Sequence, residues 1–314
     1  MNATVNAILN DRPKHLHLFL IAILFVAVAF RIYGTLSYPT EPTSDAADYH
    51  RLATNLVQQH AYVSPEGAPT AWRPPAYPFF LAGLYELIGI NVERATIAQS
   101  LLGGLTVFVL MLLGSLIIGW RQSLIAGAIA AVYPAFVWLP RLLLSENLSL
   151  FLLLLTLVTI ILYLRTSRLG WIVAFAVLCG LNSLVRGANL FLPIAAALGI
   201  LIIRWKSRSL NWSQALAPLL VMAAVFGLTL LPWTIRNYGV FHEVIPVATQ
   251  DGITLYGSYW PPQRNGKLIW GTLPGTEDPA IVAASQTGDE ASASRYLRQV
   301  TLTRLRENPG FFFD

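Results

Sequence analysis

The sequence predicts an all-α polytopic membrane protein, and three observations support that prediction. Of its 314 residues, 55% are hydrophobic and only 12% are charged, which is about half the charged share of a soluble domain. The mean hydropathy of +0.57 agrees with this balance. Long apolar runs recur along the chain, and a helix satisfies all its backbone hydrogen bonds within one such run in a bilayer.

Seven apolar runs are long enough, or nearly so, to cross a bilayer, whose apolar core takes roughly 20 helical residues. They cover residues 16–33, 97–119, 123–139, 148–164, 170–184, 190–203 and 215–231. We therefore predict a bundle of about seven transmembrane helices over residues 1–233. Its first outer loop is expected at residues 37–95.

Basic residues between the runs predict the orientation of the chain, because short cytoplasmic loops are enriched in lysine and arginine. Those that share one side, if the N-terminus is cytoplasmic, are Arg12, Lys14, Arg121, Arg165, Arg168, Arg204, Lys206 and Arg208. The outer loop and the tail then face the periplasm or the exterior of an inner (plasma) membrane. Arg31, Arg141, Arg186 and Arg236 oppose this bias, so each is a candidate for a function.

The chain after residue 233 changes in character and predicts a small mixed tail, residues 234–314, on the non-cytoplasmic side. Turn signals at Asp251-Gly252 and Asn265-Gly266 separate short β-prone runs such as 244–247. Residues 289–306 have helical spacing, for a helix on the soluble side or on the membrane surface. Residues 309–314 look like the beginning of another apolar run that does not continue, which is typical of a truncated chain or of one that lost a second half.

The first outer loop concentrates charge, and its carboxylates Asp45 and Asp48 have two readings. They can cap a helix and stabilise its positive N-terminal end. A carboxylate in a partly desolvated pocket can also act as a general base toward an acceptor hydroxyl or amine. Both roles can coexist. In a helix, Asp45, Asp48 and Tyr49 share one face.

Four further charged residues have functional and structural readings. Arg73 precedes Pro74-Pro75, so it either belongs to a rigid turn or is held to bind a phosphate. Glu146, at the outer end of a span, either partners a helix dipole or serves the chemistry, since charge is costly there. Arg186 and Arg236 lie at outer helix ends, where snorkelling to lipid headgroups is the alternative to phosphate binding.

No histidine, cysteine or carboxylate spacing in the chain signals a metal site. The single cysteine, Cys179, lies in an apolar run and permits no internal disulfide. A divalent cation could bridge Asp45 and Glu146, but nothing in the sequence requires one.

Four motifs then follow one another in a fixed order. They are Ser44-Asp45 with Tyr49, Arg73-Pro74-Pro75-Ala76-Tyr77-Pro78, Leu144-Ser145-Glu146, and Leu231-Pro232-Trp233-Thr234-Ile235-Arg236-Asn237-Tyr238. In this order residues 16–260 resemble bacterial membrane glycosyltransferases of the GT-C superfamily. Within it, they resemble the group related to protein O-mannosyltransferases and the lipid A aminoarabinose transferase.

The resemblance implies an N-terminal module of about seven spans, with short membrane-parallel helices in the first outer loop. It implies sugar transfer, with inversion, from a polyprenyl-phosphate donor to a lipid, glycan or protein acceptor on the outer face. Asp45 matches the first-loop catalytic aspartate, Glu146 the second-loop acidic residue, and Arg73 a basic residue near the donor phosphate. The expected partners are this donor, membrane lipid and the acceptor, with no nucleic acid.

The remaining predicted site residues extend these matches. Arg186 and Arg236 are expected at the donor phosphate, and Asp48, Tyr49 and Tyr77 at the substrate. Two departures stand out, because Asp45 lacks an acidic neighbour and Arg186 lacks a following proline. The first leaves the metal and the acceptor class open. A flippase for lipid-linked sugars and a non-catalytic degenerate scaffold are the alternatives.

Overall fold

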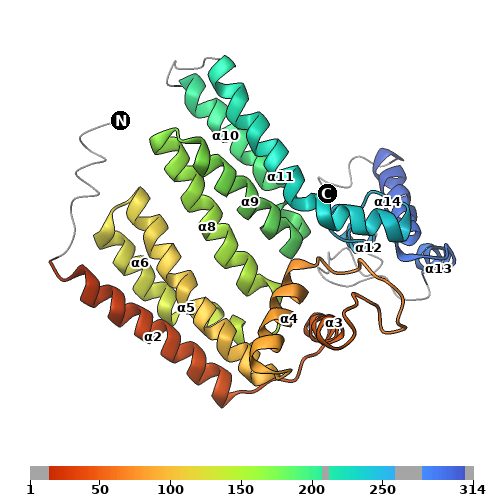
Figure 1. Ribbon diagram of the computed structural model, residues 1–314, viewed down its shortest axis with the longest axis horizontal. Coiled ribbons are helices and arrows are strands. Elements are labelled where there is room, and N and C mark those ends of the chain that lie inside the picture. Colours follow the sequence, from red (N-terminus) through yellow and green to blue (C-terminus); the bar gives the residue numbers. More distant parts are fainter. Residues whose placement is uncertain (1–13, 207–211, 259–277, 308–314) are drawn as a thin grey trace. The chain divides into compact units, whose positions relative to one another are not determined.

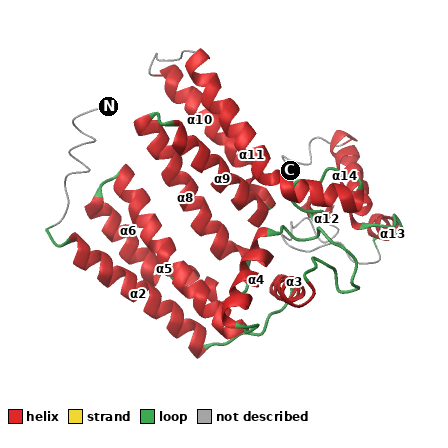
Figure 2. Ribbon diagram, viewed as in Figure 1, coloured by secondary structure: helices red, strands yellow, loops and turns green. Residues whose placement is uncertain are grey.

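The computed structural model describes residues 14–206, 212–258 and 278–307, and within them every regular element is a helix (Figure 2). The elements are α2 (Leu16–Ser37), α3 (Asp45–Gln59), α4 (Ala76–Ile88), α5 (Val92–Ile117), α6 (Trp120–Val132), α7 (Pro134–Trp138), η1 (Leu139–Arg141), α8 (Ser145–Thr166), α9 (Leu169–Val185), η2 (Gly187–Phe191), α10 (Leu192–Lys206), α11 (Trp212–Phe241), α12 (Asp251–Ser258), α13 (Pro279–Ser285) and α14 (Glu290–Glu307). The prediction of an all-helical protein is therefore confirmed for the described residues.

Four of the described helices are long and apolar enough to cross a membrane. They are α2, α5, α8 and the part of α11 from Leu216 to Phe241. A fifth span is possible where α6 and the following Pro134–Arg141 segment form one bent pair. Helices α9 and α10 are apolar but shorter. This set of helices makes the chain a multi-pass membrane protein.

We predicted one continuous span at 123–139, and the structure instead has two segments with a bend between them. Helix α6 ends at Val132, and the chain bends by 57° before Pro134 starts the next segment. Tyr133 between them is extended, with φ −64° and ψ 122°. Proline disfavours a helical conformation in the residue before it and lacks the N–H that would continue the hydrogen-bond ladder.

Helix α5 packs against α2, α6 and α8 in the membrane bundle (Figure 1). Small residues allow these approaches, as is common between membrane helices. A Cβ atom at Gly103 or Gly104 would collide with the Arg31 or Val28 side chain of α2. Gly127 of α6 likewise leaves room for Met111 of α5.

The segment that we predicted as the first outer loop contains two short helices, α3 and α4, that pack against each other. Their shared core includes Ala53, Leu81 and Tyr85, together with Leu143 from the segment before α8. Helix α3 therefore buries one face, and Asp45 at its start remains exposed.

The chain divides into two compact units. The first holds residues 1–61 and 76–230, and the second holds residues 62–75 and 231–314. A piece of the predicted first outer loop, residues 62–75, thus belongs to the same compact unit as the tail.

The tail differs from the mixed structure that we predicted, because the regular elements among its described residues are all helices, namely the end of α11 and α12 to α14. Residues 244–247 form no strand. The carbonyl oxygens of Ile245 and Val247 accept hydrogen bonds from the Asn237 and Trp233 side chains of α11, so they do not serve a neighbouring strand. The helix predicted at 289–306 is confirmed as α14. The Asn265-Gly266 turn and residues 309–314 lie outside the described residues.

Candidate functional site

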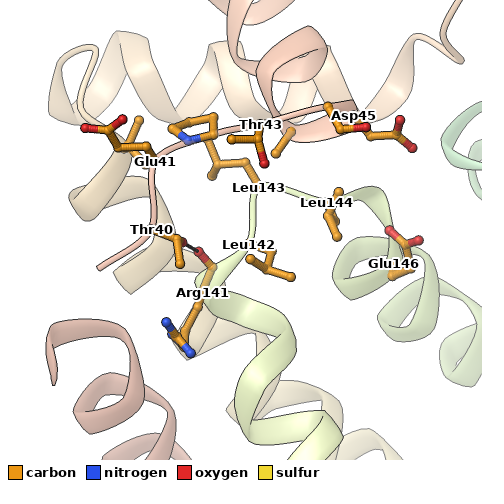
Figure 3. Close-up of a pocket in the computed structure, with 13 residues that line it drawn as sticks. Thr40, Glu41, Thr43, Asp45, Arg141, Leu142, Leu143, Leu144 and Glu146 are labelled. Atoms are coloured by element: carbon orange, nitrogen blue, oxygen red, sulfur yellow. Dashed lines mark hydrogen bonds between the residues drawn. The ribbon is translucent and has the colours of Figure 1, made fainter. Parts of the chain in front are cut away.

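A cavity of about 300 Å³ opens in the first unit, where the chain enters α3 and where η1 leads to α8 (Figure 3). Its lining consists of Thr40, Glu41, Pro42, Thr43, Ser44, Asp45, Ala46, Val92, Arg141, Leu142, Leu143, Leu144 and Glu146. Asp45 and Glu146 stand about 100 residues apart in the sequence, and the fold brings both to this cavity. Two of the sequence-predicted site residues therefore share one hollow.

Asp45 reaches the cavity because α3 begins at this residue. Ser44 takes the N-cap position that we expected for Asp45, and its side chain makes no capping hydrogen bond. The φ of Ser44 is +50°, a conformation that costs a residue other than glycine about 1–3 kcal/mol. This sharp turn puts Asp45 and Asp48 in the first helical turn, where the helix dipole favours carboxylates.

Glu146 lies in the first turn of α8 and is paired with an arginine from another helix. Arg186, which follows α9, places its Nη1 atom 2.5 Å from Glu146 Oε1. The same nitrogen donates to Ser145 Oγ at 3.4 Å. Both charged side chains remain about 40% exposed, so a negatively charged ligand can still reach the guanidinium.

Tyr49 ties the helix that carries Asp45 to the helix that carries Glu146. Its hydroxyl donates to Ser145 Oγ at 3.3 Å, and its ring packs edge-on against Tyr77, with centroids 4.8 Å apart. The contact is long for a hydroxyl hydrogen bond, so we expect a modest contribution from it.

Tyr77 is fully buried and donates to Gln99 Oε1 at 2.9 Å. Burial is the main cause that raises the pKa of Tyr77 well above its ordinary value. Tyr49, Tyr85 and Glu146 add to the increase, and the hydrogen bond to Gln99 opposes it.

The predicted substrate-binding residues Asp48, Tyr49 and Tyr77 do not line the cavity. Asp48 pairs with Arg51 at 3.0 Å, one turn along the same helix. Tyr49 and Tyr77 are buried. Their contacts join α3, α4, α5 and α8.

The two remaining predicted phosphate ligands, Arg73 and Arg236, belong to the second unit. Arg73 is only 6% exposed, and its Nη1 atom donates to Gln250 Oε1 at 3.0 Å. Arg236 donates to the carbonyl oxygens of Thr70 at 2.7 Å and Tyr62 at 3.1 Å. Both guanidinium groups are thus engaged with the chain itself.

Arg141 lines the cavity, although the sequence marked it only as an arginine on the outer side. Its guanidinium lies 3.5 Å from the centroid of the Trp138 ring and donates to the Tyr38 carbonyl oxygen. Its own carbonyl oxygen accepts from Thr40 Oγ1 at 3.0 Å. The guanidinium points away from Asp45 and Glu146 (Figure 3), so Arg141 fixes the entry to the loop rather than facing the carboxylates.

Among the described residues, no group of three or more histidine, cysteine, aspartate or glutamate side chains could hold a metal ion.

A family model described as "Dolichyl-phosphate-mannose-protein mannosyltransferase" matches residues 72–233, just over half of the chain. No curated protein matches the sequence. The matched segment includes Arg73, Tyr77, Glu146 and Arg186, whereas Asp45 precedes it.

Proposed function

The chain belongs to the dolichyl-phosphate-mannose-protein mannosyltransferase family of the GT-C superfamily, and from this we propose that it uses a polyprenyl-phosphate sugar donor. The sugar passes to an acceptor hydroxyl or amine, on a lipid, glycan or protein, at the outer face of the membrane. Membership makes the protein a glycosyltransferase in class, and the donor, the residues and the stereochemistry are our proposal.

The observation that carries the proposal is the cavity that Asp45 and Glu146 share. Asp45 is the proposed general base, because it is exposed at the cavity and starts a helix. As the acceptor oxygen or nitrogen bonds to the anomeric carbon, its proton passes to the Asp45 carboxylate. The bond from that carbon to the phosphate oxygen breaks, and its electron pair leaves with the polyprenyl phosphate. This direct displacement inverts the anomeric centre.

Arg186 is proposed to stabilise the charge of the leaving phosphate, and Glu146 to hold the Arg186 guanidinium in place. A polyprenyl phosphate leaves readily, so the site needs positive charge near the departing oxygen more than it needs an acid. Arg186 supplies that charge, and Glu146 holds its guanidinium at 2.5 Å. The planar guanidinium suits a phosphate because two N–H groups can bind two oxygens together.

The remaining predicted site residues do not line this cavity, but they keep their proposed roles. Arg73 and Arg236 are assigned to the donor phosphate, and Asp48, Tyr49 and Tyr77 to the substrate. The buried contacts of Tyr49 and Tyr77 favour an indirect role, in which they fix the helices that bear the acidic residues.

The proposed membrane arrangement has about seven spans over residues 1–233, a cytoplasmic N-terminus, and the tail of residues 234–314 on the outer side of an inner membrane. Helices α9 and α10 would complete the four or five longer spans, and α3 and α4 would lie parallel to the membrane. The positions of basic residues in the sequence support this orientation.

Asp45→Asn tests the proposed base. Purified protein would be given a radiolabelled polyprenyl-phosphate sugar and an acceptor, and transfer would be measured. We expect a loss of roughly 10²- to 10⁴-fold, which is the usual contribution of a general base. Glu93→Gln, at an exposed carboxylate in the first turn of α5, serves as the matched control with unchanged transfer. Near-normal transfer by Asp45→Asn would remove Asp45 from this role.

Movement of a lipid-linked sugar across the membrane, without transfer, is the competing function. The observation that favours it is the 57° break between α6 and the Pro134–Arg141 segment, since broken helices are common in transporters. Vesicles that contain the protein and a fluorescent lipid-linked sugar distinguish the two. Exchange between leaflets in the absence of any transfer product would favour the transporter.

A further inference from the structure

Residues 62–75 come from the first outer loop but belong to the compact unit of the tail. The segment bends back on itself, since Tyr62 OH donates to the Arg73 carbonyl oxygen at 2.9 Å. The Tyr62 ring also packs edge-on against Trp233, with centroids 5.0 Å apart. The segment that carries Arg73 is therefore a closed loop packed on residues from beyond position 230.

Residues from the tail donate hydrogen bonds to backbone carbonyl oxygens of this segment. Arg236 donates to the carbonyl oxygens of Tyr62 and Thr70. The Thr249 N–H donates to the Ala71 carbonyl oxygen at 2.9 Å. Because buried backbone groups need partners, the conformation of the segment depends on these contacts.

Glu290 holds the same segment through both of its carboxylate oxygens. Oε2 accepts from Thr70 Oγ1 at 2.7 Å, and Oε1 accepts from the Ala71 N–H. Thr70 Oγ1 in turn accepts from the Trp72 N–H at 3.0 Å. Hydrogen bonds to an ionised acceptor are stronger than those between neutral groups. One carboxylate thus contacts Thr70 and Ala71 directly, and it reaches Trp72 through Thr70 Oγ1.

The helix that presents Glu290 is itself firmly placed. Ser294 of α14 donates to Asp251 Oδ1 at 2.9 Å, and the Gly252 N–H donates to Ser294 Oγ. A Cβ atom at position 252 would collide with the backbone of Ser294. Helices α12 and α14 are therefore in close contact at the end where Glu290 projects.

Arg73 receives a second contact from the start of α12. Its Nη1 atom donates to Gln250 Oε1, the residue directly before that helix. Pro74 and Pro75 restrict the backbone on the other side of Arg73. The tail therefore contacts both the chain that leads to this arginine and the guanidinium itself.

We infer that Glu290 is a positioning residue, which sets the conformation of the Thr70–Trp72 backbone and through it the place of the Arg73 guanidinium. The inference rests on the proposed role of Arg73 at the donor phosphate. Glu290 lies beyond the segment that the family model matches, which ends at residue 233. The tail thereby tunes affinity for the donor without contacting it.

The test compares Glu290→Ala with Glu290→Gln in the full chain. Alanine removes both acceptors, whereas the glutamine amide can accept from the Ala71 N–H and donate to Thr70 Oγ1. We expect backbone hydrogen exchange at residues 70–72 to quicken about tenfold in Glu290→Ala. The KM for the polyprenyl-phosphate donor should rise by a similar factor, with kcat within about twofold. Glu290→Gln should restore most of both values.

Glu307→Ala, at an exposed position of the same helix, is the control and should change neither quantity. Unchanged exchange at 70–72 in Glu290→Ala overturns the inference. So does exchange that quickens equally throughout α12 and α14, because Glu290 would then only hold the tail together. Arg73→Ala measured alongside separates the two proposals. If it leaves the donor KM unchanged, the phosphate role of Arg73 fails, and hydrogen exchange alone decides the role of Glu290.

Discussion

Charged side chains are used differently in the cavity of the first unit and in the second unit around Arg73. Glu146 lines the cavity and pairs with Arg186, which is not among the lining residues, and both side chains remain about 40% exposed. In the second unit, Arg73 is 6% exposed, and Arg236 and Glu290 bind backbone groups. Exposed pairs contribute little to stability, whereas loss of a buried donor leaves costly unsatisfied acceptors. The exposed pair is therefore suited to chemistry, and the buried contacts of the second unit are suited to holding the loop that carries Arg73.

Arg186→Ala is the sharpest way to test this contrast at the cavity. Without the guanidinium, charge on the leaving phosphate is less stabilised, and we expect transfer to fall roughly 10²- to 10³-fold. Stability should change by less than about 1 kcal/mol, because the ion pair is exposed. Single-turnover transfer and thermal unfolding in detergent measure the two effects.

Arg295→Ala provides the matched control for Arg186→Ala. Arg295 forms a partly exposed ion pair with Glu243 at 2.7 Å in the tail, and its loss should leave both transfer and stability nearly unchanged. A large loss of stability with Arg186→Ala, and intact transfer by the protein that stays folded, would reverse the assignment of the cavity to chemistry.

Arg236→Ala tests the other side of the comparison. The change leaves the Tyr62 and Thr70 carbonyl oxygens without their donor and removes a guanidinium that lies 4.9 Å from the Trp233 ring centroid. We expect a destabilisation of about 2 kcal/mol, measured as denaturant-dependent proteolysis of the second unit. Arg236→Lys keeps the charge but not the fork of donors, so it should recover only part of that loss. A stability within 0.5 kcal/mol of wild type, roughly the range of neutral surface changes, would contradict the holding role.

Tyr49→Phe should have a smaller effect. It deletes the hydroxyl that joins α3 to Ser145 but keeps the ring against Tyr77. The deleted contact is long, so we expect about 1 kcal/mol, which is up to about fivefold in kcat/KM. Tyr33→Phe, at an exposed tyrosine of α2, is the control. Equal values for the two variants would show that the hydroxyl contact does not align the acidic residues.

The smallest expected effect concerns pH and His50. Burial lowers the pKa of His50 from 6.5, and its Nδ1 atom lies 2.7 Å from the Tyr85 hydroxyl. The folded state therefore binds fewer protons at His50 than the unfolded state, so this group adds no cost above pH 6.5 and destabilises increasingly as pH falls toward the folded pKa. His50→Gln should flatten that part of the acid slope of thermal stability. An unchanged slope would exclude His50 as a contributor.

Several features could be predicted from the sequence because they depend on local composition. Apolar runs determined that the chain forms membrane helices, and the spacing of residues 289–306 determined α14. Local patterns were less informative where side chains, rather than a neighbouring strand, form the hydrogen bonds to backbone carbonyl oxygens. Residues 244–247 have strand-like composition, yet side chains of α11 take the Ile245 and Val247 carbonyl oxygens. The proline at 134 was visible, but the 57° bend that it accompanies was missed.

The sequence by itself determined the class of the protein, the order of its motifs and the presence of acidic residues at the start of two helices, since hydropathy and capping are encoded within a few neighbouring positions. Tertiary structure alone decided that Asp45 shares a cavity with Glu146, that Glu146 pairs with Arg186, and that residues 62–75 join the tail. Such pairings join residues 40 to more than 200 positions apart. They depend on how whole helices pack, which no local pattern of residues specifies.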